Sequence, residues 1–304
     1  MPPTFDVLSY GTIGIDTILR VPYLPTPGRG AHAREETEHL GGKAANVAVH
    51  LAYWGLKVAI SGTAIGDDWV GERLDAILAQ HPNISTRYLR RVAGLKSMYC
   101  RILVTPDGDR TIIGVHVDEN PQTPPTPEMI ADARLLTLDL YGGAERVEAA
   151  RLALEAGRPV VVGDVRSPEH PILPYASVAI ASAAEVRSDH PTMTLGDFAQ
   201  AVRAAGARQV IITDGPHDVL AFDADGSCVA ITPPQVTVVD TTGAGDAFRA
   251  GVVYGVLAGW PLVECAALGA AAGAIKVGRS GAASHPAQLD EVRALAGALK
   301  RRIL

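Results

Sequence analysis

Short apolar runs rich in β-branched residues alternate along the chain with alanine-rich segments of helical periodicity, such as Glu145–Ala156 and Leu195–Ala205. This alternation predicts an α/β fold with βαβ units around a mostly parallel sheet, where ligands collect at the carboxyl ends of the strands. The predicted strands are Asp6–Tyr10, Lys57–Thr63, Leu135–Leu140, Pro159–Asp164, Ser177–Ala181, Gln209–Thr213 and Val219–Phe222. Acidic residues follow strand-like runs at or near that edge: Asp16, Asp139, Asp164, Glu185 and Asp214.

Two stretches depart from this alternation. Arg20–Leu40 holds several prolines and glycines before an alternating segment. Leu95–Val117 is typical of a hairpin, because apolar and polar residues alternate on both sides of the turn signal Asp107-Gly108. The proline-rich stretch Pro121–Pro127 is expected to lead back to the main domain.

Composition and charge exclude several classes of protein. The 304 residues are 47% hydrophobic and carry a net charge of −6, so the chain lacks the excess of basic residues typical of nucleic-acid-binding proteins. No apolar run reaches the roughly 18 residues of a membrane-spanning helix, and the N-terminus lacks a signal peptide's pattern. The three cysteines lie far apart without a CxxC pair, which predicts a reducing, cytoplasmic location and neither a disulfide framework nor a zinc site.

The run Asp-Thr-Thr-Gly-Ala-Gly-Asp at residues 240–246 carries the clearest chemical signal. A predicted strand, Val236–Val239, precedes it, and a helix follows Gly243. The glycines let backbone N–H groups face an anion at the helix start, where the helix dipole adds roughly half a positive charge. Asp246 would repel a phosphate unless it takes part in the chemistry, so the run predicts an anion hole with a built-in base.

Other interpretations of this run are weaker. No P-loop string occurs in the chain, and Phe248 stands where a dinucleotide fingerprint needs its third glycine. A glycine-rich N-cap with Asp246 as a favourable first-turn acid is the structural alternative.

A second glycine-rich run, at residues 41–55, also precedes a helical stripe of apolar residues. Lys43 and Asn46 fall in its first turn. Because Lys43 is a cation and Asn46 both donates and accepts hydrogen bonds, the pair suits a polyhydroxylated ligand better than a bare phosphate. The alternative is that Asn46 merely bonds to backbone in a fraying turn.

Together the two runs resemble the ribokinase-like, or PfkB-type, carbohydrate kinase family. The family's G-G-x-x-x-N motif and its D-T-x-G-A-G-D motif are matched here by Gly41, Gly42, Asn46, Asp240, Thr241, Gly243, Ala244, Gly245 and Asp246. The resemblance covers essentially the whole chain. It implies a three-layer sandwich with a mostly parallel central sheet, formed by a single domain, residues 1–304. It also implies a small β-sheet lid made by segments of about 17–40 and 95–118.

The resemblance also implies roles for individual residues. Asp246 is the expected catalytic base, and the backbone at Gly243, Ala244 and Gly245 is the expected anion hole for the transferring phosphoryl group. The substrate is expected to contact Asp16, Gly42, Lys43, Asn46, Asp139 and Arg101.

The resemblance places the nucleotide, ATP, on the other side of the anion hole. The expected contacts are Ser182, Glu185, Thr213, Gly215, Arg166, Ala270, Gly273 and Val277. Glu185, through water, and Asp164 are the expected ligands of Mg²⁺. Asp240 and Thr242, with carbonyls near Gly278–Ser284, match a region where many relatives hold a monovalent cation, for which K⁺ is the candidate.

The chain departs from the family pattern at four positions. An N-x-x-E motif is replaced by Ser182-Ala-Ala-Glu185, and D-x-N is replaced by Asp164-Val-Arg166. Gly14 stands where asparagine is common, and Asp218 where glycine is common. Arg166 could bind phosphate as a charge-assisted donor, or else pair with Glu169 at the surface.

These observations predict an ATP-dependent kinase that phosphorylates a hydroxyl of a sugar or sugar-like molecule. A nucleoside kinase of the same family is the nearest alternative. A catalytically weak sugar-binding or regulatory protein on this fold is the alternative from another class. The lid strands offer an edge that could pair in a homodimer, while a monomer fits equally well.

Overall fold

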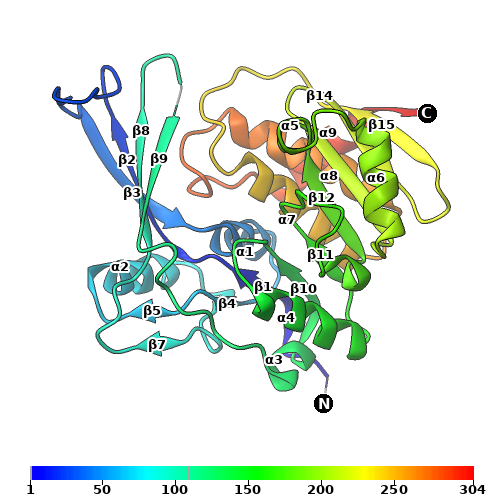
Figure 1. Ribbon diagram of the computed structural model, residues 1–304, viewed down its shortest axis with the longest axis horizontal. Coiled ribbons are helices and arrows are strands. Elements are labelled where there is room, and N and C mark those ends of the chain that lie inside the picture. The colour runs from blue at the N-terminus through cyan, green and yellow to red at the C-terminus, as the bar shows by residue number, and fades with distance from the viewer. Residues whose placement is uncertain (1, 109) are drawn as a thin grey trace.

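A ten-stranded sheet forms the centre of the computed structural model, which describes residues 2–108 and 110–304 (Figure 1). Met1 and Asp109, which fall within the predicted domain and hairpin, lie outside the described residues. The seven strands predicted from the alternation are confirmed, and the sheet is parallel except for β14, β15 and β16 at one end. In spatial order its strands are β16 (Lys300–Ile303), β15 (Cys228–Thr232), β14 (His217–Phe222), β13 (Gln209–Asp214), β12 (Val178–Ser182), β11 (Val160–Val162), β10 (Ala133–Leu138), β1 (Phe5–Gly11), β4 (Val58–Gly62) and β6 (Ile84–Ser85).

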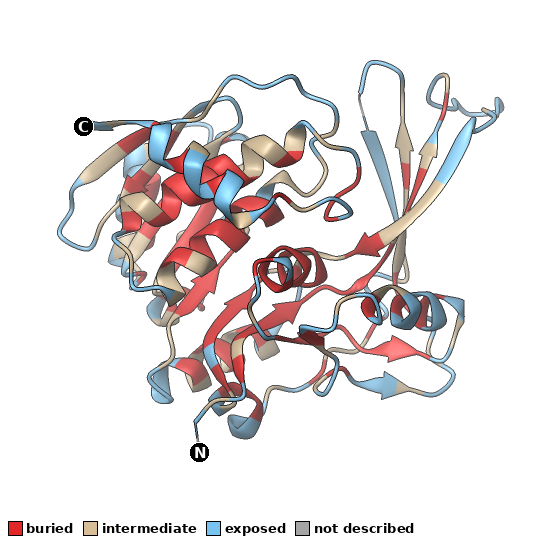
Figure 2. Ribbon diagram, turned by 180° about the vertical axis from the view of Figure 1, so that it is seen from behind, coloured by how far each residue is buried: buried red, intermediate tan, exposed pale blue. Residues whose placement is uncertain are grey.

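Helices cover both faces of this sheet, which gives the expected three layers. Side chains alternate between the faces along each strand, so Val7 of β1 packs into one core while Leu8 packs into the other. One face is covered by α1 (Lys43–Tyr53), α2 (Trp69–Leu78), α7 (Ala244–Leu257), α8 (Leu262–Val277) and α9 (Leu289–Ala298). The other is covered by α3 (Pro127–Ala131), α4 (Ala144–Glu155), the short 3₁₀ helix η1 (Leu173–Tyr175), α5 (Ala183–Asp189) and α6 (Leu195–Ala204). Figure 2 shows that the central strands and parts of the helices beside them are buried.

A separate sheet projects from the main body beside the N-termini of α1 and α7 (Figure 1). Within the described residues it has four strands, in the order β3 (Glu35–Gly41), β2 (Gly14–Arg20), β8 (Tyr99–Val104) and β9 (Arg110–Val115). We call this sheet the lid. The predicted hairpin is confirmed as β8 and β9, and the lid begins at Gly14, earlier than the predicted residue 17. A further pair of short strands, β5 (Ile65–Gly66) and β7 (Arg91–Val92), lies at its base.

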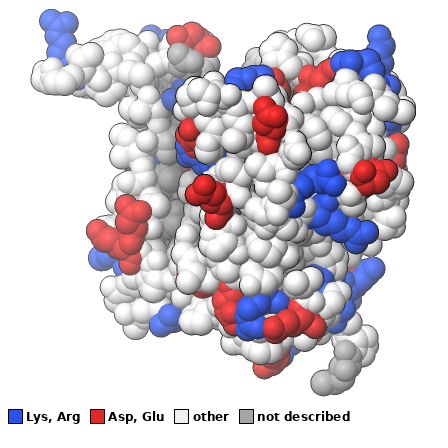
Figure 3. Space-filling model, turned by 45° about the vertical axis from the view of Figure 1, so that its right-hand side comes forward, with Lys and Arg blue, Asp and Glu red and all other residues white. Residues whose placement is uncertain are grey.

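Strand register decides which lid side chains face the main body. Asp16 is paired with Cys100, and alternate residues from there share its face. That face touches the main body at three points, where Arg110 bonds to Thr241, His39 to Ser284 and Arg20 to Ser280. We call it the inner face. In Figure 3 a groove separates the lid from the main body, and positive and negative side chains are interspersed over this view of the surface.

One predicted strand is wrong. Val236–Val239 is an irregular, largely exposed segment, and Val238 is 63% exposed. Two prolines, Pro233 and Pro234, come just before it and lack the N–H groups that a sheet ladder needs. The segment instead runs along the end of α8, where the N–H groups of Val239 and Asp240 both bond to the carbonyl of Val277.

No helix in the described part of the chain is both long and apolar enough to cross a membrane.

Candidate active site

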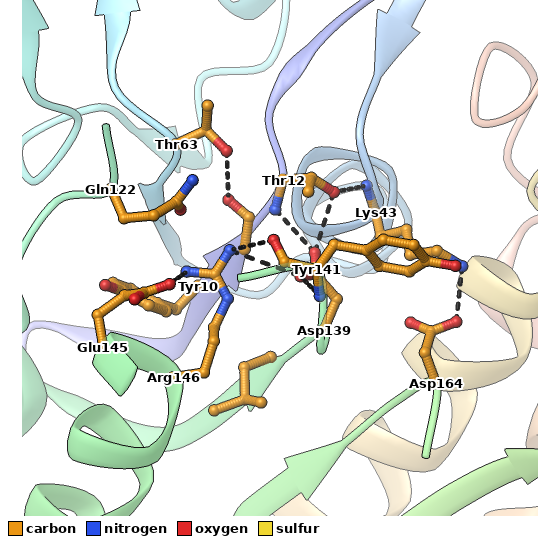
Figure 4. Close-up of polar contacts among 12 residues, drawn as sticks. Tyr10, Thr12, Lys43, Thr63, Gln122, Asp139, Tyr141, Glu145, Arg146 and Asp164 are labelled. Carbon is orange, nitrogen blue, oxygen red and sulfur yellow. Dashed lines mark hydrogen bonds and ion pairs between the residues drawn. The ribbon is translucent and has the colours of Figure 1, made fainter. Parts of the chain in front are cut away.

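The two glycine-rich runs meet at the carboxyl edge of the central sheet. Strands β1, β10 and β11 end there at Gly11, Leu138 and Val162, and helices α1 and α7 begin there. Figure 4 shows side chains from these strand ends converging with Lys43 of α1. Asp139, Asp164, Glu185 and Asp214 therefore lie after or at strand ends of this edge as predicted, whereas Asp16 lies in lid strand β2.

Glycine is required at both helix starts. Gly243 has φ 76°, and a Cβ there would lie 2.7 Å from the carbonyl oxygen of Ala282. Gly42 has φ 87°, and a Cβ there would lie 2.4 Å from the carbonyl oxygen of Thr12. These backbone conformations disfavour any other residue. They direct the first turns of α7 and α1 toward the same space.

Asp246 lies in the first turn of α7 and is 7% exposed. Its Oδ2 accepts a hydrogen bond of 2.9 Å from Nδ2 of Asn46 on α1, so the two motifs are in direct contact. Burial raises the pKa of Asp246, while the cations of Lys43 and Arg249 oppose the rise. A carboxylate of raised pKa at a helix N-terminus is suited to accepting a proton beside an anion.

Lys43 forms an ion pair across the site. Its Nζ lies 2.6 Å from Oδ1 of Asp164 and 5.2 Å from the centre of the Tyr141 ring (Figure 4). Burial alone would lower the pKa of Lys43, but the carboxylates of Asp164 and Asp246 raise it above its ordinary value. Lys43 is therefore a fixed cation. Asp164 itself has φ 61°, an uncommon conformation for a residue other than glycine.

Sequence reasoning missed Arg249, which lies 3% exposed one turn after Asp246. Its Nη1 donates to the carbonyl of Leu138 and its Nη2 to that of Lys43, both at 3.0 Å. The guanidinium also lies 3.7 Å from Asp246 and 3.8 Å from Asp164. The sequence did contain a signal for it, because Arg249 follows Asp246 by three residues and residues three apart share a helix face.

Asp16 lies on the inner face of the lid, directed at the main body. Burial and the nearby carboxylate of Asp246 raise the pKa of Asp16 to about 7, and a hydrogen bond with Cys100 partly offsets this. Asp16, Asn46 and Asp246 thus lie near one another, as the prediction of one substrate pocket requires.

Arg101 is not part of this pocket, so its assignment as a substrate contact is wrong. It is paired in register with Thr17, one residue from Asp16, and so points to the opposite, outer face of the lid. There it bonds to Glu36 at 3.3 Å and stacks over Tyr99 and Trp69.

Asp139 does not reach the pocket either, because its carboxylate is fully buried below it. Its Oδ2 accepts hydrogen bonds from the N–H and hydroxyl of Thr12, and its Oδ1 accepts one from the N–H of Tyr141 (Figure 4). The guanidinium of Arg146, which is 1% exposed, lies 3.6 Å away. With 0% exposure and these partners, Asp139 fixes the strand ends rather than a ligand.

The predicted nucleotide residues lie at the ends of β11, β12 and β13. Asp164, Glu185 and Arg166 all influence the pKa of the Tyr141 hydroxyl, so they lie within electrostatic range of it. Arg166 pairs with Asp189 rather than Glu169, through hydrogen bonds of 2.8 and 2.9 Å. Ser182 and Thr213 are neighbours across β12 and β13, and Gly215 follows in the turn.

The three α8 residues expected at the adenine make packing contacts. Ala270 is 5% exposed and belongs to the hydrophobic core. A Cβ on Gly273 would lie 3.2 Å from the carbonyl oxygen of Ala244, so this position packs against the start of α7. Val277 offers its carbonyl to the segment before Asp240.

Asp240 is surrounded by donors from the chain itself. The N–H groups of Thr242 and Gly281 bond to its two carboxylate oxygens, both at 2.8 Å. The ammonium of Lys276 donates to its backbone carbonyl at 2.6 Å. These partners do not fit the predicted monovalent cation site, because a bound cation needs free oxygens and this one would lie beside an ammonium.

The fold and the site together define a class of protein, the carbohydrate kinases. The chain matches the sequence model of the pfkB family carbohydrate kinases over residues 4–288, and it belongs to that family.

Individual relatives agree with this assignment. The chain is 29% identical to acarbose 7(IV)-phosphotransferase of Actinoplanes sp., with 93% of this chain and 97% of that protein covered. It is also 29% identical to ribokinase of Haemophilus influenzae, with 93% and 95% covered. Among solved structures, that of Arabidopsis thaliana ribokinase complexed with ribose and ATP superposes with a TM-score of 0.82 at 23% identity, covering 97% of this chain and 99% of that one.

We expect Asp16→Asn to stabilise the free protein at neutral and higher pH. Because the folded-state pKa of Asp16 is raised to about 7, against about 3.9 for an unfolded aspartate, the folded protein holds this proton more tightly than the unfolded chain. Its stabilising contribution is therefore full below pH ~4 and is lost as the pH rises to ~7. The amide cannot ionise, so the variant should gain on the order of a few kcal/mol over wild type across that window.

Calorimetric melting between acid and alkaline pH would measure this gain. Asp118→Asn, at an exposed position, is the matched control and should track the wild type. A stability difference between Asp16→Asn and wild type that stays constant with pH would contradict the raised pKa.

Proposed function

We propose that the protein transfers the γ-phosphoryl group of ATP to a hydroxyl of a sugar or sugar-like substrate. The observation that carries this proposal is the buried Asp246, hydrogen-bonded to Asn46, in the first turn of a helix that begins at Gly243. The substrate hydroxyl loses its proton to Asp246 as its oxygen attacks the γ-phosphorus. The bond from that phosphorus to the β-γ bridging oxygen breaks, and ADP leaves. In this proposal the backbone N–H groups at Gly243, Ala244 and Gly245 stabilise the charge on the transferring group. The N–H of Ala244, which donates to the carbonyl of Thr241 at 3.3 Å, would exchange that partner for the phosphate.

The substrate is proposed to lie between the inner face of the lid and the first turn of α1. Asp16 and Asn46 supply acceptors and donors for hydroxyl groups, and Gly42, which packs against the carbonyl of Thr12, sets the start of α1 beside them. Lys43 provides a fixed positive charge at the edge of this space.

ATP is proposed to lie across the ends of β11, β12 and β13. Ser182, Thr213 and Gly215 are the proposed contacts, and the carboxylates of Asp164 and Glu185 lie within electrostatic range of Tyr141. Glu185 would hold Mg²⁺ through water together with the substrate phosphates, since Mg²⁺ needs only one or two carboxylates. Asp164 could add its second oxygen, because its Oδ1 pairs with the Lys43 ammonium at 2.6 Å. When bound, Mg²⁺ would neutralise charge on the phosphates.

We expect Arg166→Ala to raise the Michaelis constant for ATP by about tenfold and to leave that for the sugar nearly unchanged. The guanidinium lies within electrostatic reach of Tyr141 and Glu185, at the side of the site proposed for phosphates. Its bidentate pair with Asp189 holds it there and leaves Nη1 free of that pair. Steady-state kinetics with each substrate varied in turn would test this.

Arg151→Ala is the matched control for Arg166→Ala, since Arg151 also forms a bidentate pair, with Glu148, on a distant helix. An Arg166→Ala variant with the control's ATP kinetics would remove Arg166 from the nucleotide site.

The function itself is tested by a coupled assay of ADP release over pentoses, hexoses, oligosaccharides including acarbose, and nucleosides. We expect one sugar or sugar-like compound to accelerate ADP release well above the background of Asp246→Asn. Preference for a nucleoside would establish the nearest alternative. If calorimetry shows that sugar binds but no compound in the panel accelerates ADP release, the protein is a sugar-binding protein on this fold.

A further inference from the structure

Lys276 is a buried lysine at the end of α8 that the proposed chemistry does not use. It is 4% exposed, yet its ammonium is directed at a single residue, Asp240. Nζ donates to the Asp240 carbonyl oxygen at 2.6 Å and lies 3.6 Å from Oδ2 of the same residue. Lysines are seldom this buried unless a carboxylate pairs with them. Here the partner is Asp240, which begins the loop at residues 240–243.

Asp240 connects its own loop, the end of α8 and the loop after α8, and these segments position the start of α7. Its carboxylate accepts the N–H of Thr242 in its own loop and that of Gly281 in the loop after α8. Three residues after Asp240, Gly243 packs so tightly against Ala282 that no side chain fits there. The position of the anion hole therefore depends on how the loop at residues 240–243 is held against the end of α8.

The charges around Lys276 favour its own ammonium beside Asp240 and disfavour a second cation there. Asp240 and Asp246 attract the ammonium, whereas Arg110 of the lid and the burial of the group oppose its charge and lower the pKa of Lys276. His50 of α1 lies within electrostatic range of it, and burial together with the charges of Lys276 and Arg279 lowers the pKa of His50 to about 4, so that it stays neutral at pH 7. A further metal cation beside this ammonium would be repelled and would find the Asp240 oxygens already bonded.

We propose that Lys276 is a positioning residue whose ammonium serves as a built-in monovalent cation, holding the loop at residues 240–243 so that no inorganic ion is needed. The ammonium supplies what such an ion would supply, a positive charge against the Asp240 carbonyl and carboxylate. Because it is covalently attached, it is present at any salt composition. The inference rests on the proposed kinase function only where activity is the readout.

The first test uses the wild-type protein in potassium, sodium and tetramethylammonium chloride at equal ionic strength. We expect the melting temperature and kcat to be unchanged among the three salts. Specific stabilisation or activation by potassium over tetramethylammonium would overturn the proposal.

The second test replaces the ammonium by an apolar chain of similar length in Lys276→Met. In tetramethylammonium chloride we expect a lower melting temperature and a loss of about tenfold or more in kcat, because a buried charged hydrogen bond is lost. The substitution frees the backbone carbonyl of Asp240 and the place of the ammonium. Potassium or ammonium ions can enter there and should restore both quantities, whereas tetramethylammonium is too large to do so. Lys57→Met, at an exposed position, is the control for loss of one positive charge.

The outcomes separate this inference from the proposed function. The melting temperatures test Lys276 even if no protein in the series releases ADP, so failure of the kinase assay does not affect them. Lys276→Met with wild-type melting and kcat in tetramethylammonium chloride, or a loss that potassium and ammonium ions do not relieve, would overturn the proposal. If Lys276→Met does not fold, the salt series on the wild type decides alone.

Discussion

Asp246→Asn should lower kcat by on the order of 10²–10⁴ while nucleotide affinity stays nearly the same, because the amide cannot accept the substrate's proton. The substitution keeps the size of the side chain, and an amide oxygen can still accept the hydrogen bond from Asn46. Burial raises the pKa of Asp246, which means that the ionised carboxylate is costly at this position. We therefore expect the variant to be at least as stable as wild type at pH 7.

The combination of a large loss in kcat with an undiminished melting temperature distinguishes a catalytic base from a structural first-turn acid. A helix-stabilising acid would show the opposite pattern, with lower stability and little change in rate. Asp225→Asn, in an exposed turn, is the matched control and should leave both quantities unchanged. Turnover of Asp246→Asn within about tenfold of wild type would remove Asp246 from the role of base.

The glycine-rich runs could be interpreted from sequence because the backbone forces their composition. Gly42 and Gly243 both have φ near +80°, and each meets another segment's backbone at a distance that excludes a Cβ. A sequence pattern records such requirements directly. It does not record the partner, so the packing of Gly243 on Ala282 and the role of Asp240 beside Lys276 required the structure.

The wrong assignments have a common physical origin, which is that local pattern leaves orientation undetermined. Alternation in β8 separated Arg101 from Cys100, but nothing in the sequence said which of the two faces the site. Asp139 follows its strand at the predicted edge, yet Thr12 and Arg146 hold its carboxylate within the protein. Val236–Val239 has the composition of a strand and lacks a neighbouring strand with which to pair among the described residues.

Arg249→Leu should destabilise the protein by about 3–5 kcal/mol, since it removes one of the two cations of a buried ion cluster and leaves Lys43 alone with two carboxylates. The guanidinium bonds to the carbonyls of Leu138 and Lys43 and lies within 4 Å of the carboxylates of Asp246 and Asp164. It thereby ties the end of β10 and the starts of α1 and α7 to one another. Urea unfolding at pH 7 would measure the loss.

The same substitution should also change the pH dependence of catalysis. Arg249 is one of the cations that lower the pKa of Asp246, so removing it raises that pKa further. A general base works only when ionised, and a higher pKa means that activity begins to fall at a higher pH on the acid side. Arg249→Lys keeps the charge but not both carbonyl hydrogen bonds, so it should lose stability with a smaller displacement of the acid limb.

Arg146→Leu is the matched control, because Arg146 is equally buried and lies beside a different carboxylate, Asp139. It should destabilise the protein to a similar extent without moving the acid limb of the kcat profile. If Arg249→Leu and Arg146→Leu lost stability alike and both kept the wild-type acid limb, Arg249 would be a structural residue only. Displacement of the limb in Arg249→Leu alone would show that this arginine sets the proton affinity of Asp246 as well as its position.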